Sequence, residues 1–340
     1  MHNKVTPFFL LVFLLSAFST SSQSRETTSP QPRETLLAPV KIGDQWGYID
    51  KTGKIAISPQ FDEARQFQEG LAMIRLGSKW GYVDKSGKTA INPQFDFAWS
   101  FKEGMAPIQL GGKCGYIDRT GKIVINPQFE FAWSFQEGVG KIKLGGKYGY
   151  IDRTGKTIAG PQFEDSWDFQ EGQAKVKLGG KYGYIDKTGK VTIKPQFDDA
   201  GGFHEGLAEV KLGDKWTYID KTGKTAIDLQ FEDAGNFREG LAGAKLGGKW
   251  GYIDKSGKIV IQLQFDGTMW FQEGLAAIQL GSKWGYIDKT GKITIRPQFD
   301  AALNFQEGMA QILLGGKSGF IDKTGKVTIN PQFDAAWGFK

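Results

Sequence analysis

Two aromatic pairs, Phe97 with Trp99 and Phe131 with Trp133, occur in the same short sequence, Phe-Ala-Trp, 34 residues apart. Aromatic rings on neighbouring loops form a flat apolar surface, which suits stacking on a sugar ring or anchoring a protein partner. We therefore take Phe97, Trp99, Phe131 and Trp133 as the candidate ligand-binding residues. The alternative is that these rings pack onto the next part of the fold as additional core.

Acidic residues recur as well, and they raise the question of a metal site. Asp84, Asp96 and Glu103 have equivalents along the whole chain, but they are 7 to 12 residues apart and Lys85 follows Asp84. Calcium needs about six to eight oxygen ligands, usually from closely spaced acids in one loop. We therefore predict that these acids cap turns, and we expect no metal or cofactor.

Groups suited to catalysis are scarce. The chain has two histidines, and His204 stands where neighbouring copies of its segment have glutamine or lysine. No serine or cysteine has a local histidine arrangement, and no phosphate-binding glycine loop leads into a helix. Polar residues that recur in each copy, such as Gln94 and Glu103, fit structural hydrogen bonds at junctions better than catalysis. We predict no catalytic residues; an enzyme with a carboxylate pair between units is the alternative.

These residues belong to a 34-residue sequence unit that occurs nine times without insertion or deletion. Its marker position is held by Trp46, Trp80, Cys114, Tyr148, Tyr182, Trp216, Trp250, Trp284 and Ser318. A period of this length, kept over so many copies, indicates a stacked array of one small structural unit. Each copy has at least three glycines and usually a proline, which excludes the helix pairs of other repeats of this length.

Within a copy the apolar residues alternate with a period of two, which predicts strands. Gly77 and Ser78 suit a two-residue hairpin turn, and Asp84 to Gly87 fit a type I turn that ends in a left-handed glycine. Each unit is therefore predicted to be a three-stranded antiparallel meander, followed by a connecting segment, 96–104, with one helical turn. The sheet face with Ile74 is the expected core. The face with Trp80 is expected to be partly buried or stacked on the next unit.

We predict an all-β array over residues 37–340 that stacks as an open, twisted solenoid or superhelix. The first unit begins with its own strand, 37–42, and the last unit supplies its own third strand, 327–333. No strand is then shared between the chain ends, and nothing requires the ends to meet. A closed, propeller-like ring is the alternative, although propeller blades usually have four strands.

The N-terminal segment differs from the array. Lys4 precedes an apolar run from Phe8 to Phe18, and small and polar residues follow, which is typical of a signal peptide. We place the signal peptide at 1–19 and a disordered spacer, rich in Ser, Thr and Pro, at 20–36. The apolar run is shorter than the roughly 20 residues of a membrane span. We expect an exported protein, periplasmic or extracellular, with no membrane span after cleavage; an uncleaved leader is the alternative.

The charge pattern argues against a nucleic-acid partner. The formal net charge is +6, but acids and lysines alternate within every copy, as at Asp84, Lys85 and Lys88. Interspersed charges form a solvated surface, whereas a nucleic-acid binder needs a continuous basic stripe. The single cysteine, Cys114, has no partner for an intramolecular disulfide, so packing between units must provide the stability.

The unit resembles the WG repeat family, also called KWG repeats. The residues that carry the resemblance run from Lys79 to Lys88, from Pro93 to Asp96 and from Phe101 to Ala106, and the pattern covers 37–340. The resemblance implies a bacterial-type repeat module with no catalytic residues to transfer. Cys114, Thr217 and Ser318 depart from the motif.

Together, these features predict an exported, non-enzymatic scaffold that binds an envelope or extracellular protein. Each unit would add a weak contact along one multivalent surface. One alternative is a glycan-binding or cell-wall module that uses the four candidate aromatic residues to hold a polysaccharide. The other is an enzyme with a cleft between repeats.

Overall fold

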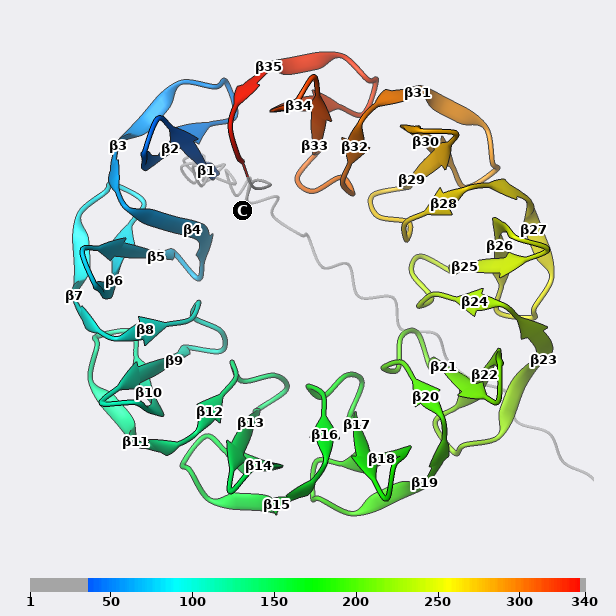
Figure 1. The fold of residues 1–340 in the computed structure, drawn as a ribbon, viewed down its shortest axis with the longest axis horizontal. Coiled ribbons are helices and arrows are strands. Elements are labelled where there is room, and N and C mark those ends of the chain that lie inside the picture. The colour runs from blue at the N-terminus through cyan, green and yellow to red at the C-terminus, as the bar shows by residue number, and fades with distance from the viewer. Residues whose placement is uncertain (1–35, 337–340) are drawn as a thin grey trace, which may run out of the picture. The chain divides into compact units, whose positions relative to one another are not determined.

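The computed structural model describes residues 36–336 (Figure 1). The predicted signal peptide at 1–19 lies outside the described residues, as does the predicted spacer at 20–36 except for its last residue. The described residues belong to one compact unit. Within the described part of the chain, no helix has the length and apolar character needed to span a membrane.

The repeated element is a small antiparallel sheet, which we call a blade. Blade one has three strands: β1 (Leu37–Ile42), β2 (Gln45–Asp50) and β3 (Ile55–Phe61). Blades two to five each have four: β4 (Glu63–Gln68), β5 (Leu71–Leu76), β6 (Lys79–Asp84), β7 (Thr89–Phe95); β8 (Phe97–Ala98), β9 (Met105–Leu110), β10 (Lys113–Asp118), β11 (Ile123–Phe129); β12 (Phe131–Ala132), β13 (Val139–Leu144), β14 (Lys147–Asp152), β15 (Thr157–Phe163); β16 (Asp165–Ser166), β17 (Gln173–Leu178), β18 (Lys181–Asp186), β19 (Val191–Phe197). Blades six to nine also have four: β20 (Asp199–Ala200), β21 (Leu207–Leu212), β22 (Lys215–Asp220), β23 (Thr225–Phe231); β24 (Asp233–Ala234), β25 (Leu241–Leu246), β26 (Lys249–Asp254), β27 (Ile259–Phe265); β28 (Gly267–Thr268), β29 (Leu275–Leu280), β30 (Lys283–Asp288), β31 (Ile293–Phe299); β32 (Ala301–Ala302), β33 (Met309–Leu314), β34 (Lys317–Asp322), β35 (Val327–Phe333).

The three long strands of each blade confirm the predicted meander. In blade three, Lys113 pairs with Leu110 across the glycine turn, in an antiparallel register. The connecting segment does not form the predicted helical turn. Its first residues form a short strand, such as β8, which pairs with β9 of the following unit. Each unit therefore donates a fourth strand to the next blade, a feature that the sequence pattern of a single unit does not reveal.

The blades form a closed ring, a nine-bladed β-propeller, so the prediction of an open solenoid is wrong and the ring alternative is right (Figure 1). Backbone contacts join the two ends of the described chain: Ala336 forms an isolated antiparallel bridge with Val40, and the Lys41 amide donates to Ala335 O at 3.4 Å. Blades nine and one also share an apolar core, made of Ala38, Val40, Ile49, Met309, Phe320, Ile329, Phe333 and Ala336. We call this core the closure cluster.

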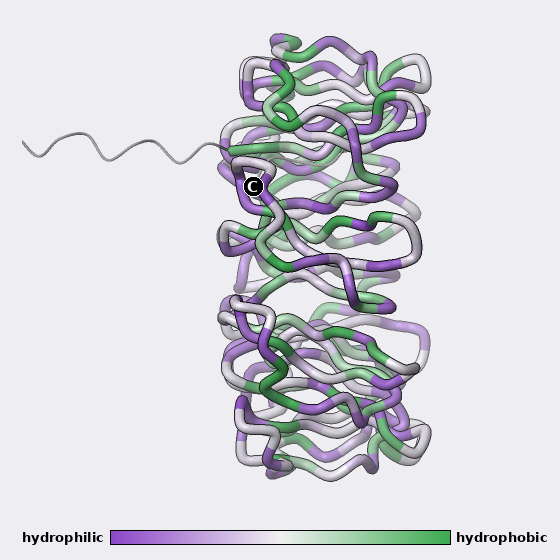
Figure 2. The backbone as a smooth tube through the Cα atoms, turned by 90° about the vertical axis from the view of Figure 1, so that its left-hand side faces the viewer, coloured by the Kyte–Doolittle hydropathy of each residue, from purple (hydrophilic) through white to green (hydrophobic). Residues whose placement is uncertain are grey.

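The ring closes because both faces of each blade are apolar and require a neighbour. In blade two, Ile74 and Val83 pack against blade one, whereas Trp80 and Tyr82 pack against blade three. Trp80 is 4% exposed and Tyr82 is fully buried, so of the two expectations for this face, stacking on the next unit is the correct one. Burial of one large apolar side chain stabilises by about 1.5–3 kcal/mol. An open array would leave one such face in water at each end. Apolar segments recur along the tube in the edge-on view (Figure 2).

The repeated glycine and tyrosine have separate structural reasons. A Cβ atom on Gly81 would lie 2.6 Å from Ile91 O in the adjacent strand, so this close approach requires glycine. The Tyr82 hydroxyl donates to Trp99 O in blade three at 2.7 Å. The equivalent tyrosine bond recurs in eight blades. Tyrosine therefore joins each sheet to the loop of the next blade.

The recurring acids are structural, as predicted. Asp84 Oδ1 accepts the backbone N–H groups of Ser86 at 2.9 Å and Lys88 at 3.1 Å, and the Ser86 hydroxyl bond holds the pKa of Asp84 below its usual value. Asp96 Oδ2 accepts the N–H of Gly111 at 2.8 Å in the next hairpin turn. Within residues 36–336, no group of three or more His, Cys, Asp or Glu side chains is placed to hold a metal ion.

The recurring glutamates link successive blades near the ring axis. Their loops, between the short strand and the next long strand, point toward the axis in Figure 1. Glu103 has a φ of 53° and its carboxylate accepts the N–H of Gly138, one blade further, at 2.9 Å. Lys51 of blade one donates to Glu307 O of blade nine, across the closure of the ring. Lys323 of blade nine makes the equivalent contact with Glu273 O of blade eight. The predicted junction role is confirmed for this column. The glutamine column differs, since Gln128 Nε2 bonds Asn126 O within its own strand.

Two substitutions at Glu137 separate the energy of this link from the backbone strain. The Glu137 carboxylate accepts the Gly172 N–H at 2.9 Å and pairs with Lys187 Nζ at 3.0 Å, while its φ is 53°. Glu137→Ala loses the charge-assisted bonds and keeps the strain, so we expect the free energy of unfolding to fall by about 1–2 kcal/mol. Glu137→Gly tolerates positive φ and should cost about 1 kcal/mol less. Guanidinium chloride titration measures the free energy of unfolding of both variants. Equal losses in the two variants would show that the positive φ of Glu137 carries no strain energy.

Candidate functional site

The four predicted ligand-binding residues lie together on one arc of the ring. Phe97 and Trp99 belong to blade three, and Phe131 and Trp133 belong to blade four. The ring centroids are 4.6 Å apart for Phe97 and Trp99, 5.6 Å for Trp99 and Phe131, and 5.1 Å for Phe131 and Trp133. The four side chains therefore form one continuous row across the junction between two blades.

Two further rings extend this row at its ends. Trp80 of blade two lies 5.0 Å from Phe97, and Tyr148 of blade four lies 5.7 Å from Trp133. We call these six residues, Trp80, Phe97, Trp99, Phe131, Trp133 and Tyr148, the aromatic band. Phe131 is 41% exposed, whereas Phe97 and Trp99 are half-buried and also pack on the cores between blades. The band is thus mostly an outer part of the core, with Phe131 as its exposed ring.

Buried lysines continue the band into blade five. Lys141 Nζ lies 4.5 Å from the Trp133 ring centroid and donates to Ser166 O at 3.1 Å. Lys175 repeats this arrangement one blade later, because its Nζ lies 3.7 Å from the Trp167 ring centroid and donates to the carbonyl of Ala200. We call each pair a lysine plug. Burial lowers the pKa of both lysines, while nearby carboxylates oppose that change.

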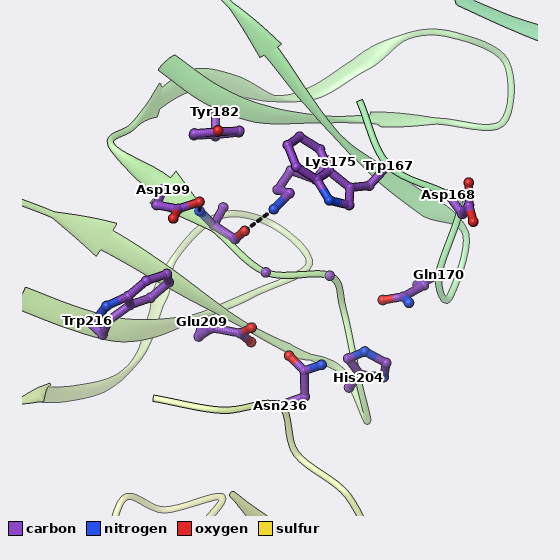
Figure 3. A pocket seen from close by; sticks show the side chains of 13 residues that line it. Trp167, Asp168, Gln170, Lys175, Tyr182, Asp199, His204, Glu209, Trp216 and Asn236 are labelled. Atoms are coloured by element: carbon purple, nitrogen blue, oxygen red, sulfur yellow. Dashed lines mark hydrogen bonds between the residues drawn. The ribbon is translucent and has the colours of Figure 1, made fainter. Parts of the chain in front are cut away.

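The pattern breaks in blade six, where a cavity of about 520 Å³ replaces the plug (Figure 3). Glu209 occupies the position of Lys175, and Gly201 occupies the position of Trp167. We call this space the blade-six cavity. It is lined by Trp167, Asp168, Gln170, Lys175, Tyr182, Asp199, Ala200, Gly201, Gly202, His204, Glu209, Trp216 and Asn236, from blades five, six and seven.

Two glycines form the cavity floor because neighbouring polar groups take the space of a side chain. A Cβ atom on Gly201 would overlap the carboxylate of Glu209, and one on Gly202 would overlap the amide of Gln170. Gly201 stands where blades three to five have tryptophan, and a side chain there requires the Glu209 carboxylate to move. The missing ring leaves room for a ligand.

Glu209 is the most buried acid of the cavity, at 8% exposure. Asn236, with its amide oriented to satisfy both neighbours, donates to Glu209 Oε2 at 2.9 Å and accepts from His204 Nε2 at 3.1 Å. Burial raises the pKa of Glu209 to about 8, Lys175 opposes this rise, and Asp199 and Asp233 add to it. Burial also lowers the pKa of His204. Figure 3 shows Glu209 and Asn236 side by side, across the cavity from Lys175 and Trp167.

This site suits binding by charge, hydrogen bonds and ring contacts. Two indole rings, Trp167 and Trp216, stand among acid, amide and lysine groups. Of the described residues that line the cavity, none is a serine, threonine or cysteine, the usual hydroxyl and thiol nucleophiles.

The sequence-based selection missed the blade-six cavity. The available signal was a double departure from neighbouring copies: Gly201 replaces a tryptophan, and Glu209 replaces a lysine eight positions later. Each change alone resembles ordinary drift between copies. Their meaning depends on the two positions facing each other, which only the packed blades reveal.

Comparison with known proteins identifies the repeat. A family model described as "WG containing repeat" matches nine consecutive stretches of the chain: 46–80, 80–114, 115–148, 148–182, 182–216, 216–250, 250–284, 284–317 and 319–340. No match was found among curated proteins.

Solved structures resemble the fold at low sequence identity. The crystal structure of a eukaryotic initiation factor has a TM-score of 0.64 and 12% identity, and the match covers 89% of this chain and 98% of that one. Dihydro-heme d1 dehydrogenase NirN in complex with DHE has a TM-score of 0.49 and 11% identity, over 90% and 75% of the two chains. PorZ, a surface component of the type-IX secretion system of Porphyromonas gingivalis, has a TM-score of 0.31 and 12% identity, over 86% and 52%. The first likeness extends to the fold alone.

Proposed function

This chain belongs to the WG containing repeat family, and on that premise we propose that it is an exported, non-enzymatic propeller that binds a protein partner through its aromatic band. The observation that carries the proposal is the continuous row of six rings on blades two to four, with Phe131 41% exposed. Export is inferred from the sequence of residues 1–19.

The chemistry of the aromatic band favours a protein partner. Tryptophan and tyrosine dominate the binding energy of protein interfaces, because they bury a large area with little loss of side-chain entropy. Cations lie close to the rings: Arg75 is 6.0 Å from the Trp80 centroid and Lys143 is 5.2 Å from the Tyr148 centroid. Such a mixture of rings and cations suits a partner surface with apolar and acidic side chains. The rings act together, so several weak contacts combine into one stable complex.

The test is a double substitution of the exposed Phe131 and its neighbour in the band, Trp133. Phe131→Ala with Trp133→Ala should lower the affinity for a partner at least about tenfold, since two central anchors of an interface are lost. The partner is first captured from envelope extract with the immobilised protein, identified by mass spectrometry and produced separately. Its affinity for each variant is then measured by titration.

The matched control is Trp270→Ala in blade eight. Trp270 is 50% exposed, so this substitution removes a surface aromatic residue that lies outside the band. This control should leave the affinity unchanged. Equal binding by all three proteins would contradict the role of the band. Retention of a polysaccharide by the unmodified protein, lost in the double variant, would support the glycan-binding alternative instead.

A further inference from the structure

The lysine plugs show how this fold binds an ammonium group. In blades four and five, the Nζ atoms of Lys141 and Lys175 sit over tryptophan rings and donate to carbonyl oxygens of the following blade. Lys175 Nζ also lies 5.2 Å from the ring centroid of Tyr182. Aromatic faces attract cations, and the attraction strengthens where water is excluded. Each plug is therefore an ammonium site that the chain fills with its own side chain.

In blade six this site has no resident ammonium. Glu209 stands at the lysine position and Gly201 at the tryptophan position, so the cation and its ring are both missing. The exchange replaces an amine with a carboxyl group at a position that is only 8% exposed. A buried carboxylate is stable when a cation pairs with it, and it is costly to bury when ionised and unpaired. The cavity of about 520 Å³ in front of Glu209 leaves space for a cation from outside the chain.

The charges around the cavity also favour a cation. Three carboxyl groups, Asp168, Asp199 and Glu209, line it together with one lysine. That lysine, Lys175, is already engaged with Trp167 and Ala200. Asp168 pairs with Lys141 at 3.5 Å, and Asp199 and Glu209 are the other two acids of the lining. An anionic ligand would meet these carboxylates and gain little from the engaged lysine.

We propose that the blade-six cavity binds an organic ammonium group of a ligand, with Glu209 as its counter-ion and the rings of Trp167 and Trp216 beside it. The volume lies within the range of small-molecule sites, about 300–1,000 Å³, so the ligand carries its amine on a larger body. A lysine side chain of a peptide and an amino sugar share this chemistry. The site lies outside the aromatic band, and the proposal does not depend on the protein partner proposed above.

The test compares ligands that differ only in the charge of the amine. Isothermal titration of the full chain uses Nα-acetyl-lysine methylamide against its Nε-acetylated form, and glucosamine against N-acetylglucosamine. We expect one molecule of the free amine to bind per chain, at least about tenfold more tightly than the acetylated form. Tighter binding of the lysine probe would indicate a peptide source, and tighter binding of glucosamine would indicate an amino sugar.

Two variants connect the binding to the cavity. Glu209→Gln keeps the shape of the side chain and should weaken binding of the amine at least about tenfold, because the counter-ion is lost. The control, Asp228→Asn in the exposed outer strand β23 of the same blade, should bind as the unmodified protein does. The double variant Gly201→Trp with Glu209→Lys, which restores the plug residues of blade five, should not bind the amine.

Three results would overturn the proposal. The first is equal binding of free and acetylated amines, the second is unchanged binding by Glu209→Gln, and the third is no heat and no change in tryptophan fluorescence up to about 10 mM ligand. A failed partner capture with the aromatic band would not affect these measurements, so the two proposals fail separately.

Discussion

Phe333→Ala is expected to lower the free energy of unfolding by about 3–4 kcal/mol, as much as Phe197→Ala in the middle of the sequence. Phe333 belongs to the closure cluster and is 7% exposed. Phe197 ends the outer strand of blade five, belongs to the core between blades five and six, and is 3% exposed. In a closed ring both phenylalanines lie between two blades, so the same cavity is created in each case. Chemical denaturation of the two variants measures the loss.

The comparison with Phe197 distinguishes the ring from an open array. In an open array, Phe333 would lie on the free face of the last unit, and its removal would cost little. Stability in open repeat arrays depends only on nearest neighbours, so the change would also stay local. In the ring, hydrogen exchange of the β1 amides should increase in Phe333→Ala, because β1 packs on the closure cluster. A loss below about 1 kcal/mol at Phe333 alone would show that the ends do not meet.

Glu209→Gln is expected to raise the free energy of unfolding by about 2 kcal/mol at pH 7.5 in the absence of ligand. Burial raises the pKa of Glu209 from the ordinary value of 4.5 to about 8 in the folded state. Between these two pH values the unfolded chain has released the proton and the folded chain still holds it. Raising the pH through this range therefore lowers the free energy of unfolding of the unmodified protein. The glutamine variant has no proton to release at this position, so its stability does not fall in this way. The hydrogen bonds from Asn236 favour the carboxylate and reduce the gain from its upper limit of about 4 kcal/mol.

The pH profile identifies the cause. The difference between Glu209→Gln and the unmodified protein should be small below about pH 4.5 and should grow up to about pH 8. The groups that face Glu209 are Lys175, Asp199, Asp233 and His204, and they remain in both proteins. Asp228→Asn, on the exposed outer strand of blade six, should change the stability by less than about 0.5 kcal/mol at any of these pH values. A constant difference across the range would contradict the titration of Glu209.

The cost of burying Glu209 relates to the proposed ammonium site. A buried carboxylate without a charged partner costs free energy, and sites that bind ligands often retain such groups. The ammonium proposal predicts that the amine removes this cost. Melting temperatures of the unmodified protein should therefore rise with added amine, through the preference of the ligand for the folded state.

Much of the local structure could be predicted from the sequence because local residues determine it. The alternation of apolar residues and the glycine turns fix three strands per unit, such as β9, β10 and β11. Asp84 caps its own turn, and its partners lie within four residues of it. The Phe-Ala-Trp segments of two successive units were expected to lie together, and the structure places Trp99 beside Phe131. Their role in binding remains a prediction.

The unit, its period and its turns follow from the amino-acid sequence, because these depend on contacts within about 34 residues. Closure of the ring becomes evident only in three dimensions, since it depends on contacts between Val40 and Ala336, which lie far apart in the sequence. The blade-six cavity also depends on the tertiary structure, because Gly201 faces Glu209 only when the donated strand β20 pairs with β21 of the following unit. The physical reason is the same in both cases. Burial of apolar faces and of charged groups depends on which surfaces meet in three dimensions, and the order of residues within one unit does not specify that.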